Sequence, residues 1–409
     1  MHVAYLHYLW GRDTALHHVH QFADAARALG HRVDVHAMNL APPPLEGGGG
    51  GGPVPWRRRL RAGLKRRFGR WLHDPKELAW NLRYLRRESA LLRPEPPDVL
   101  LVRSHGLGVS CVPVARRLGL PLVLEINAPS EETATYQRHY VPWTRTRRWA
   151  GRYKLRHADA ITVVSGALGD HYAERLGVQR DRLHVVPNGA DLERFHPDVP
   201  PDPRVASDRG QPGDDQDAAP WIGYVGSFQA WHALDRLATL VETVARSRPS
   251  SRFLMVGDGP GLERLRALDL PPPRLVCTGR VEHARVPGLV AALDIGVLAE
   301  IAWYQCPLKV IEWMAAGTAI VAPGHPPLHE LLRDGEEGLL FPPGDLEAAI
   351  RQVERLVDDP ALRRRLGAAA ARKAHASLGW RHNAERMLDA CRAAATHHAA
   401  RRPATGDRQ

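Results

Sequence analysis

Residues 306–322 read CPLKVIEWMAAGTAIVA, which predicts a helix followed at once by a strand. Pro307 suits the first position of a helix, because the N–H that proline lacks would be unpaired there. Gly317 can take the left-handed conformation that ends a helix. The apolar run 319–322 that follows is typical of a buried strand. This stretch therefore predicts one helix–strand unit of an α/β domain.

The alternation of strands and helices continues outward from this stretch. Buried strands are predicted at 221–225, 253–256, 275–278, 295–298 and 319–322, and in the first half of the chain at 3–8, 33–36, 99–103, 122–126 and 160–164. Helix-length sequence separates them, as crossovers between parallel strands require. We therefore expect an α/β protein with two doubly wound, Rossmann-like domains facing each other across a cleft.

A segment rich in Pro, Asp and Gly separates the two halves. We expect an N-terminal domain over 1–196, a linker over 197–220 and a C-terminal domain over 221–379. A helix over 380–395 is expected to pack back on the N-terminal domain, and the tail 396–409 to be disordered.

Composition narrows the function without naming it. The 409 residues carry a net charge of +11, which favours an anionic partner such as a nucleotide diphosphate, a nucleic acid or an acidic lipid. The four cysteines have no C-x-x-C spacing, which argues against a zinc site and a disulfide framework. No run of eighteen apolar residues occurs, and the N-terminus reads as a strand rather than a signal peptide. We expect a cytoplasmic protein.

Lys309 and Glu312 are the candidate catalytic residues. The start of the helix after Pro307 offers free backbone N–H groups that can bind phosphate, and Lys309 adds a full positive charge. Glu312 lies one turn further on, where a carboxylate can hold the two hydroxyls of a ribose. The same spacing also suits an ordinary i,i+3 ion pair on a surface helix. Spacing alone does not decide between the two.

Further motifs link the chain to a known family. They are VPNGAD at 186–191, IGYVGS at 222–227, VGDGP at 256–260 and TGRV at 278–281, beside the PLKxxExMAxG pattern that starts at Pro307. Together and in this order they resemble family 4 of the retaining GT-B glycosyltransferases, over nearly the whole chain from Met1 to about Cys391. The resemblance implies a nucleotide-sugar donor on the C-terminal domain, an acceptor on the N-terminal domain and retention of configuration.

The resemblance also implies a set of donor-binding residues around Lys309 and Glu312. These residues are Gly226, Ser227, His232, Gly257, Arg280, Val281, Tyr304, Pro307 and Leu308. Gly226-Ser227 stands where other members carry an arginine, so the diphosphate charge is expected to fall on Lys309, on helix N-termini and on His232. His232 also suits a polar residue that opens a surface helix.

One position departs from the family pattern. Members usually carry two glutamates eight residues apart, and the first of them falls here on Tyr304, which has no carboxylate. Glu300 lies nearby but out of register. The Cys-Pro-Leu-Lys sequence resembles a branch in which Ser-Pro-Leu-Lys replaces the first glutamate region.

The candidate acceptor-side residues lie in the first half of the chain. Glu125 and Asn127 stand at the carboxyl end of the strand 122–126, at the edge where ligands of parallel sheets bind, although they also suit the capping of the next turn. His17 lies near the start of the first helix, where relatives have a glycine-rich turn near the phosphates.

Residues 56–72 form a basic amphipathic pattern. Eight basic residues and no acid occur between Arg57 and Arg70, with apolar residues every three to four positions. Such a helix can lie on an anionic membrane surface, and it can equally pack its apolar stripe on the domain and expose its charges to water. No pattern typical of nucleic-acid recognition appears, so no nucleic acid is expected.

The sequence thus predicts a metal-independent, retaining hexosyltransferase-like enzyme that moves a sugar from a nucleotide-diphosphate sugar to a glycan, lipid-linked or small-molecule acceptor. No Asp-x-Asp stands at a strand end, so neither a metal nor another cofactor is expected. A dehydrogenase is disfavoured, because no Gly-x-Gly-x-x-Gly opens a helix after a strand. The remaining alternative is a catalytically weak, membrane-associated scaffold on the GT-B fold, which Tyr304 and the basic segment suggest.

Overall fold

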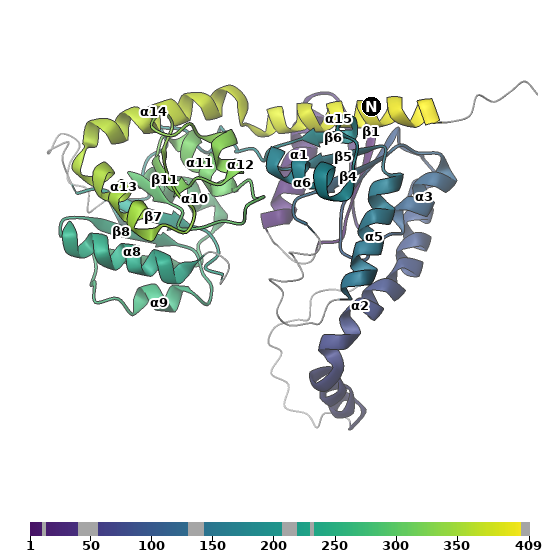
Figure 1. The fold of residues 1–409 in the computed structure, drawn as a ribbon, viewed down its shortest axis with the longest axis horizontal. Helices are drawn as coiled ribbons and strands as arrows, with labels where there is room; N and C mark the ends of the chain where they lie inside the picture. Colours follow the sequence, from purple (N-terminus) through teal and green to yellow (C-terminus); the bar gives the residue numbers. More distant parts are fainter. Residues whose placement is uncertain (10–13, 40–55, 130–142, 207–218, 230–232, 402–409) are drawn as a thin grey trace, which may run out of the picture. The chain divides into compact units, whose positions relative to one another are not determined.

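A computed structural model describes residues 1–9, 14–39, 56–129, 143–206, 219–229 and 233–401, and for 14–15 and 56–72 only the backbone. The described chain divides into two compact units. Unit 1 comprises Met1–Val164, Leu168–Val186 and the chain from Ala384, and unit 2 comprises Ser165–Ala167 and Pro187–Asn383. Figure 1 shows a sheet flanked by helices in each unit.

Unit 1 is built on a six-stranded parallel sheet in the order β2-β1-β3-β4-β5-β6. Its strands are β1 (His2–His7), β2 (Arg32–Ala37), β3 (Val99–Arg103), β4 (Leu122–Ile126), β5 (Ala160–Val163) and β6 (Leu183–Val185). Its helices are α1 (Thr14–Ala28), α2 (Trp56–Leu92), α3 (Cys111–Leu118), α5 (Thr144–His157), α6 (Gly166–Leu176) and the short η1 (Arg180–Arg182).

The last helix, α15 (Trp380–Arg401), completes the core of unit 1. Its residues Ala384, Met387, Leu388, Cys391 and Ala394 recur at helical spacing and are buried against residues of β1 and α1, such as Tyr5 and Phe22. Because α15 continues to Arg401, the expectation of disorder from Thr396 is wrong for 396–401. The rest of that tail, 402–409, lies outside the described residues.

Unit 2 is built on a second six-stranded parallel sheet, in the order β12-β11-β10-β7-β8-β9. Its strands are β7 (Trp221–Val225), β8 (Arg252–Val256), β9 (Leu275–Gly279), β10 (Ile295–Val297), β11 (Ala319–Pro323) and β12 (Leu339–Phe341). Its helices are α7 (Pro203–Ala206), α8 (Leu234–Ser247), α9 (Leu262–Arg266), η3 (His283–Arg285), α10 (Val286–Ala291), α11 (Leu308–Ala316), α12 (Pro326–Leu331), α13 (Leu346–Asp358) and α14 (Pro360–Ser377).

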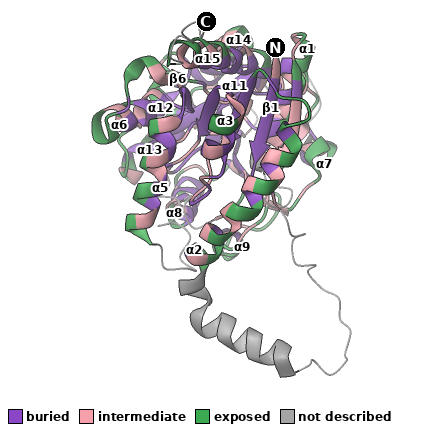
Figure 2. Cartoon of the chain, turned by 90° about the vertical axis from the view of Figure 1, so that its right-hand side faces the viewer, coloured by how far each residue is buried: buried purple, intermediate pink, exposed green. Residues whose placement is uncertain are grey.

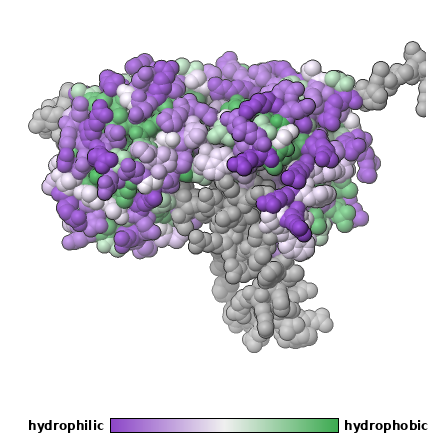
Figure 3. Space-filling model, in the orientation of Figure 1, coloured by the Kyte–Doolittle hydropathy of each residue, from purple (hydrophilic) through white to green (hydrophobic). Residues whose placement is uncertain are grey.

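Helices and strands lie where side-chain patterns allow burial on one or both faces. The strands are mostly buried, and the helices turn buried residues inward and exposed ones outward (Figure 2). On the face drawn in Figure 3, the described surface is mostly hydrophilic, with apolar residues in small scattered patches. Asp345 and Asp359 cap α13 and α14 by accepting hydrogen bonds from the backbone N–H of Ala348 and Leu362.

The doubly wound fold and the predicted strands are confirmed, with strand ends that differ by at most one residue. Two three-residue strands at the sheet edges, β6 and β12, were not predicted as strands, because three residues carry too little periodicity. Gly317 ends α11 in the left-handed conformation, as expected. Pro307 instead precedes α11, since its ψ of 118° is extended.

Candidate functional site

Two glycine turns close the carboxyl ends of the central strands of unit 2. Gly226 follows β7 and Gly257 follows β8, with φ angles of +150° and +127°. A Cβ atom on Gly257 would lie 2.0 Å from the carbonyl oxygen of Gly226, and one on Gly226 would lie 2.9 Å from Nζ of Lys309. Both positions therefore require glycine, and neither turn has a side chain at that position to block a ligand from its backbone. Ligands of doubly wound sheets bind at this edge.

Lys309 brings its ammonium group to this edge. Its Nζ donates a hydrogen bond of 2.7 Å to the hydroxyl of Tyr224, the fourth residue of β7, and lies 4.2 Å from the centroid of that ring. Tyr224 is 1% exposed, so the ring holds the ammonium firmly beside Gly226. Pro307, the residue before α11, supplies no side-chain cap, and Leu308 and Lys309 are the first two residues of the helix. The positive charge of Lys309 and the N-terminus of α11 thus lie at the same edge of the sheet.

Lys309 and Glu312 do not form the surface ion pair that their spacing allows. Within the described chain, Glu312 makes no hydrogen bond or salt bridge, and Lys309 donates a hydrogen bond to Tyr224 instead. Burial lowers the pKa of Lys309 to about 7, against the attraction of Glu312. Burial raises the pKa of Glu312 to about 7, against the attraction of Lys309 and Arg194. An acid and a base perturbed in this way beside a strand edge are typical of a ligand site.

The loop between β10 and α11 carries Tyr304. This residue is 4% exposed and packs edge-on against Trp303, with ring centroids 5.4 Å apart. Asn188 holds the end of the loop, because its side-chain amide donates to the carbonyl of Cys306 at 2.6 Å. Tyr304 is therefore mostly packed into unit 2.

A polar cluster that the sequence analysis did not assemble stands at the ends of β10 and β11. Glu300 accepts a hydrogen bond from Nε2 of His325 at 2.8 Å and one from Arg236 at 3.5 Å. Its other contact is the backbone N–H of Ile301 at 3.1 Å. The available signal was that Glu300 and His325 each follow a buried strand by two or three residues. Arg236, on α8, carried no such signal.

The other expected donor residues are spread around the same sheet edge. Ser227 is exposed directly after Gly226, and its carbonyl accepts a long 3.4 Å hydrogen bond from Tyr224. Arg280 is exposed after β9 and makes no ion pair with a described residue, and Val281 beside it is half-buried. His232 lies outside the described residues.

In unit 1, Glu125 is the centre of a buried charged network. The carboxylate is 2% exposed and accepts hydrogen bonds from Arg103 at 2.7 Å, from Asn127 at 2.9 Å and from the hydroxyl of Tyr5. His18 lies 3.6 Å away. Burial alone would raise the pKa of Glu125, but Arg103 and His18 hold it below its ordinary value. Glu125 therefore neither faces open space nor caps a turn.

The other two expected acceptor-side residues, Asn127 and His17, lie in or next to this network. Asn127 serves it as a hydrogen-bond donor and is half-buried. His17 on α1 is half-buried, next to the buried His18. Burial lowers the pKa of His18 to about 4, so this imidazole is neutral at pH 7. The arrangement gives β4 an ionised carboxylate held by an internal counter-charge.

One group of side chains has the composition of a metal site. His73, Asp74 and Glu77 bring their ligand atoms within 4.8 Å of one another. Arg147, which is 5% exposed on its side chain, already donates to Asp74 through Nε at 3.0 Å and to Glu77 through Nη2 at 3.0 Å. This guanidinium supplies the positive charge that a cation would bring, so the group fits a structural link between α2 and α5.

Comparison with known proteins identifies relatives over both units. The model of Glycosyltransferase Family 4 matches residues 16–194, and the model of Glycosyl transferases group 1 matches residues 219–359. The alpha-D-kanosaminyltransferase of Streptomyces kanamyceticus is 26% identical over 357 residues, which cover 84% of this chain and 85% of the relative. The 2-deoxystreptamine glucosyltransferase of the same organism is 29% identical over 69% of this chain and 74% of its own length.

Solved structures share the fold. Anabaena HepE, determined in complex with UDP, superposes with a TM-score of 0.69 at 15% identity, over 95% of this chain and 99% of that one. The sucrose-phosphate synthase of Thermosynechococcus elongatus superposes with a TM-score of 0.68 at 19% identity, over 96% and 98%. Within the described ranges, every helix is too short or too polar to span a lipid bilayer.

Proposed function

The chain belongs to glycosyltransferase family 4, and on that premise we propose that it transfers a sugar from a nucleotide-diphosphate sugar, bound on unit 2, to an acceptor with retention of configuration and without a metal ion. Use of a nucleotide-sugar donor is supported by the relatives, since HepE has been determined with UDP and with UDP-glucose. Membership of this family argues against the alternative that the protein is a dehydrogenase.

One observation carries the proposed donor site. The ammonium of Lys309 is held on Tyr224 beside Gly226, at the start of α11. A diphosphate at this point would meet two glycine turns, a helix N-terminus and the ammonium group of Lys309. Its charge would also raise the pKa of Lys309 from about 7, so that binding would protonate the amine.

The proposed roles follow from this placement. As the bond between the anomeric carbon and the phosphate oxygen breaks, its electron pair goes to the nucleotide diphosphate, whose growing charge Lys309 and α11 stabilise. The acceptor oxygen forms the new bond to the anomeric carbon, and its proton leaves with the diphosphate. Glu312, which has no described hydrogen-bond partner, is proposed to accept the ribose hydroxyls. Tyr304 is proposed to pack beside the sugar.

The acceptor is proposed to bind on unit 1 and to be a glycan, a lipid-linked molecule or a small molecule. The relatives named above act on different molecules, so they do not select one. Peripheral binding to an anionic membrane through 56–72 is part of the proposal. Its side chains lie outside the described residues, so the support for it is the sequence pattern. The scaffold alternative is not favoured, because both halves of the chain match glycosyltransferase models.

A donor panel tests the proposal. Purified protein is heated with UDP-, GDP- and ADP-sugars, and a donor at 100 times its dissociation constant is expected to add about 2.7 kcal/mol to the free energy of unfolding. The stabilising donor is then incubated with protein to follow release of nucleotide diphosphate. If no donor raises the melting temperature and none is consumed, the proposed function is wrong.

A further inference from the structure

The helix α5 carries a one-sided row of arginines that the proposed reaction does not use. Its fourteen residues, TRTRRWAGRYKLRH, contain no acid. Arg145, Arg148, Arg152 and Arg156 are exposed and follow one another at three- or four-residue spacing, which places them on one face. Arg145, Arg152 and Arg156 make no ion pair with any residue in the described ranges.

The basic residues that α5 turns inward behave differently. Arg147 is bound to Asp74 and Glu77, and Lys154 donates to the backbone carbonyls of His105 and Gly106. The charges of the inner face are thus matched within unit 1, whereas Arg145, Arg152 and Arg156 on the outer face have no acidic partner among the described residues and lie at spacings at which like charges repel one another. Like charges at this spacing destabilise a helix by a few tenths of a kcal/mol per pair. An anionic partner would remove that cost.

Aromatic side chains run beside the arginines. Trp149 is 54% exposed, and its ring stacks on that of Tyr153 one turn later, with centroids 5.5 Å apart. Trp143, just before α5, is 41% exposed. Large exposed rings next to arginines are typical of surfaces that sit at the boundary between water and lipid.

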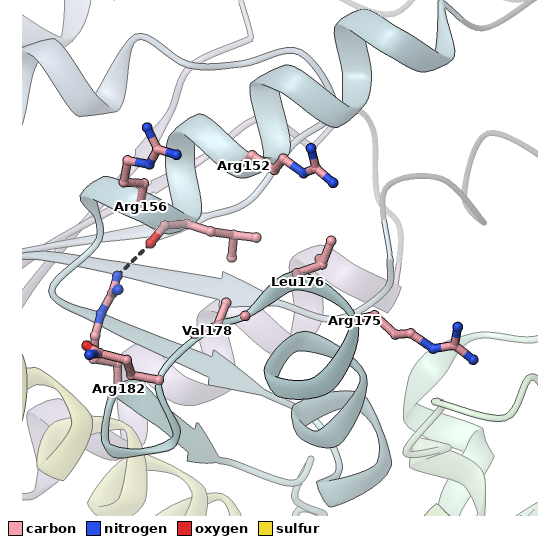
Figure 4. A pocket seen from close by; sticks show the side chains of 9 residues that line it. Arg152, Arg156, Arg175, Leu176, Val178 and Arg182 are labelled. Atoms are coloured by element: carbon pink, nitrogen blue, oxygen red, sulfur yellow. Dashed lines mark hydrogen bonds between the residues drawn. The ribbon is translucent and has the colours of Figure 1, made fainter.

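Two hollows flank this face. One, with a volume of about 360 Å³, is lined by Arg145, Arg148, Trp149, Arg152, Tyr153 and Arg156. The other, about 450 Å³, shares Arg152 and Arg156 and reaches α6 and the segment after it. Figure 4 shows Leu176 and Val178 toward the middle of the second hollow and the arginines around it, with Arg182 donating to a backbone carbonyl of α5. Among the described residues that line the two hollows, none is acidic.

We propose that this surface, the α5 basic face, docks unit 1 on an anionic phospholipid membrane. The arginines would bind lipid phosphates at the rims of the hollows, while Trp149, Trp143 and Leu176, which are all exposed, would enter the lipid boundary. Charge complementarity selects an anionic partner, and the exposed indoles select a lipid surface over a soluble anion. The acid-free segment between Arg57 and Arg70 belongs to α2, whose residues 74 and 77 are bonded to α5. This inference does not depend on the proposed transferase activity.

Vesicle co-sedimentation tests the α5 basic face in the full chain. The probes are vesicles of phosphatidylcholine alone and of phosphatidylcholine mixed with phosphatidylglycerol. We expect wild type to bind only the mixed vesicles, and Arg148→Gln/Arg152→Gln/Arg156→Gln to bind them roughly a hundredfold more weakly. Trp149→Ala should weaken binding without changing the charge. The matched control removes three exposed charges from unit 2 with Arg264→Gln/Arg364→Gln/Arg372→Gln and should bind as wild type does.

Each other outcome overturns the inference. Equal losses in the two triple variants would show a response to net charge alone, and binding to pure phosphatidylcholine would remove the role of the arginines. Displacement from mixed vesicles by excess inorganic phosphate would identify a soluble ligand. Binding of a single-stranded oligonucleotide that the α5 variant loses, without vesicle binding, would assign the face to nucleic acid.

The variant Arg148→Lys/Arg152→Lys/Arg156→Lys keeps the charge and should therefore bind mixed vesicles as wild type does. Thermal unfolding checks that each variant folds.

Discussion

Replacing Lys309 with Met should make the ligand-free protein more stable while it strongly slows transfer. Methionine fills a similar volume over the ring of Tyr224 but carries no charge. The hydroxyl of Tyr224, which loses the ammonium, keeps its long hydrogen bond to the carbonyl of Ser227. The stability gain comes from the partly buried ammonium, since burial lowers the pKa of Lys309 from 10.5 to about 7.

The size and pH dependence of the gain follow from this pKa. A drop from 10.5 to about 7 is worth roughly 5 kcal/mol, and partial exposure together with the lost contact to Tyr224 reduces the net gain to about 2 kcal/mol. Between these two pKa values the unfolded chain holds the proton more tightly, so this lysine costs stability fully below pH 7 and progressively less as pH rises toward 10.5. The gain from Lys309→Met should therefore be largest at or below pH 7 and fade in alkaline buffer.

Thermal unfolding at several pH values and donor-consumption kinetics measure the two effects. About 2 kcal/mol in a unit of this size corresponds to a rise in melting temperature of about 4–8 °C, and loss of the cation should cost about 2–4 kcal/mol in the activation free energy of transfer. Lys76→Met is the matched control, because Lys76 lies 4.8 Å from the centroid of the Trp80 ring but is exposed to solvent. A destabilised Lys309→Met variant that still consumes donor would show that Lys309 only packs unit 2.

Three further substitutions and one chelation experiment probe the same site. Glu312→Ala should weaken binding of both donor and free nucleotide diphosphate, as titration calorimetry would report, and Tyr304→Ala should slow transfer less than either Lys309→Ala or Glu312→Ala; a reversed order in initial rates would contradict the assigned roles. Gly226→Ala should reduce donor affinity at least tenfold, because the added Cβ would lie 2.9 Å from Nζ of Lys309; unchanged affinity would show that the turn does not position the lysine. EDTA should leave the rate of transfer unchanged, and activity that is lost in EDTA and restored by Mg²⁺ or Mn²⁺ would reveal a metal site.

The fold was predictable because its signal is repeated along the chain. Each buried strand is a short apolar run followed by helix-length sequence, and that pattern fixes a parallel sheet with helical crossovers. Only the three-residue edge strands β6 and β12 escaped it. The end of α15 was misplaced for a related reason, since an alanine-rich helix such as 393–400 has no strong apolar stripe to mark its extent.

The candidate site was predictable by position but not by contact. The sequence placed Lys309 at a helix start and Gly226 after a strand, yet nothing in it stated that Nζ of Lys309 lies on Tyr224 beside that glycine. Glu125 shows the limit more sharply. Its place at the end of β4 suggested an open face, whereas Arg103 and His18, from two other elements, enclose it. Such enclosure depends on residues distant in sequence, which a single chain without its fold does not reveal.

Unit 1 is built from segments that are far apart in the sequence, and this affects how it folds during synthesis. Its sheet is complete at Val185, but Ala384, Met387, Leu388, Cys391 and Ala394 of α15 arrive only after all of unit 2 has been made. At 5–20 residues per second, a ribosome needs roughly 10–40 s to cover that interval. During it, the apolar surface of β1 and α1 waits uncovered, open to chaperones and to other nascent chains. Unit 2, whose residues from Pro187 to Asn383 are continuous, can close its own core first.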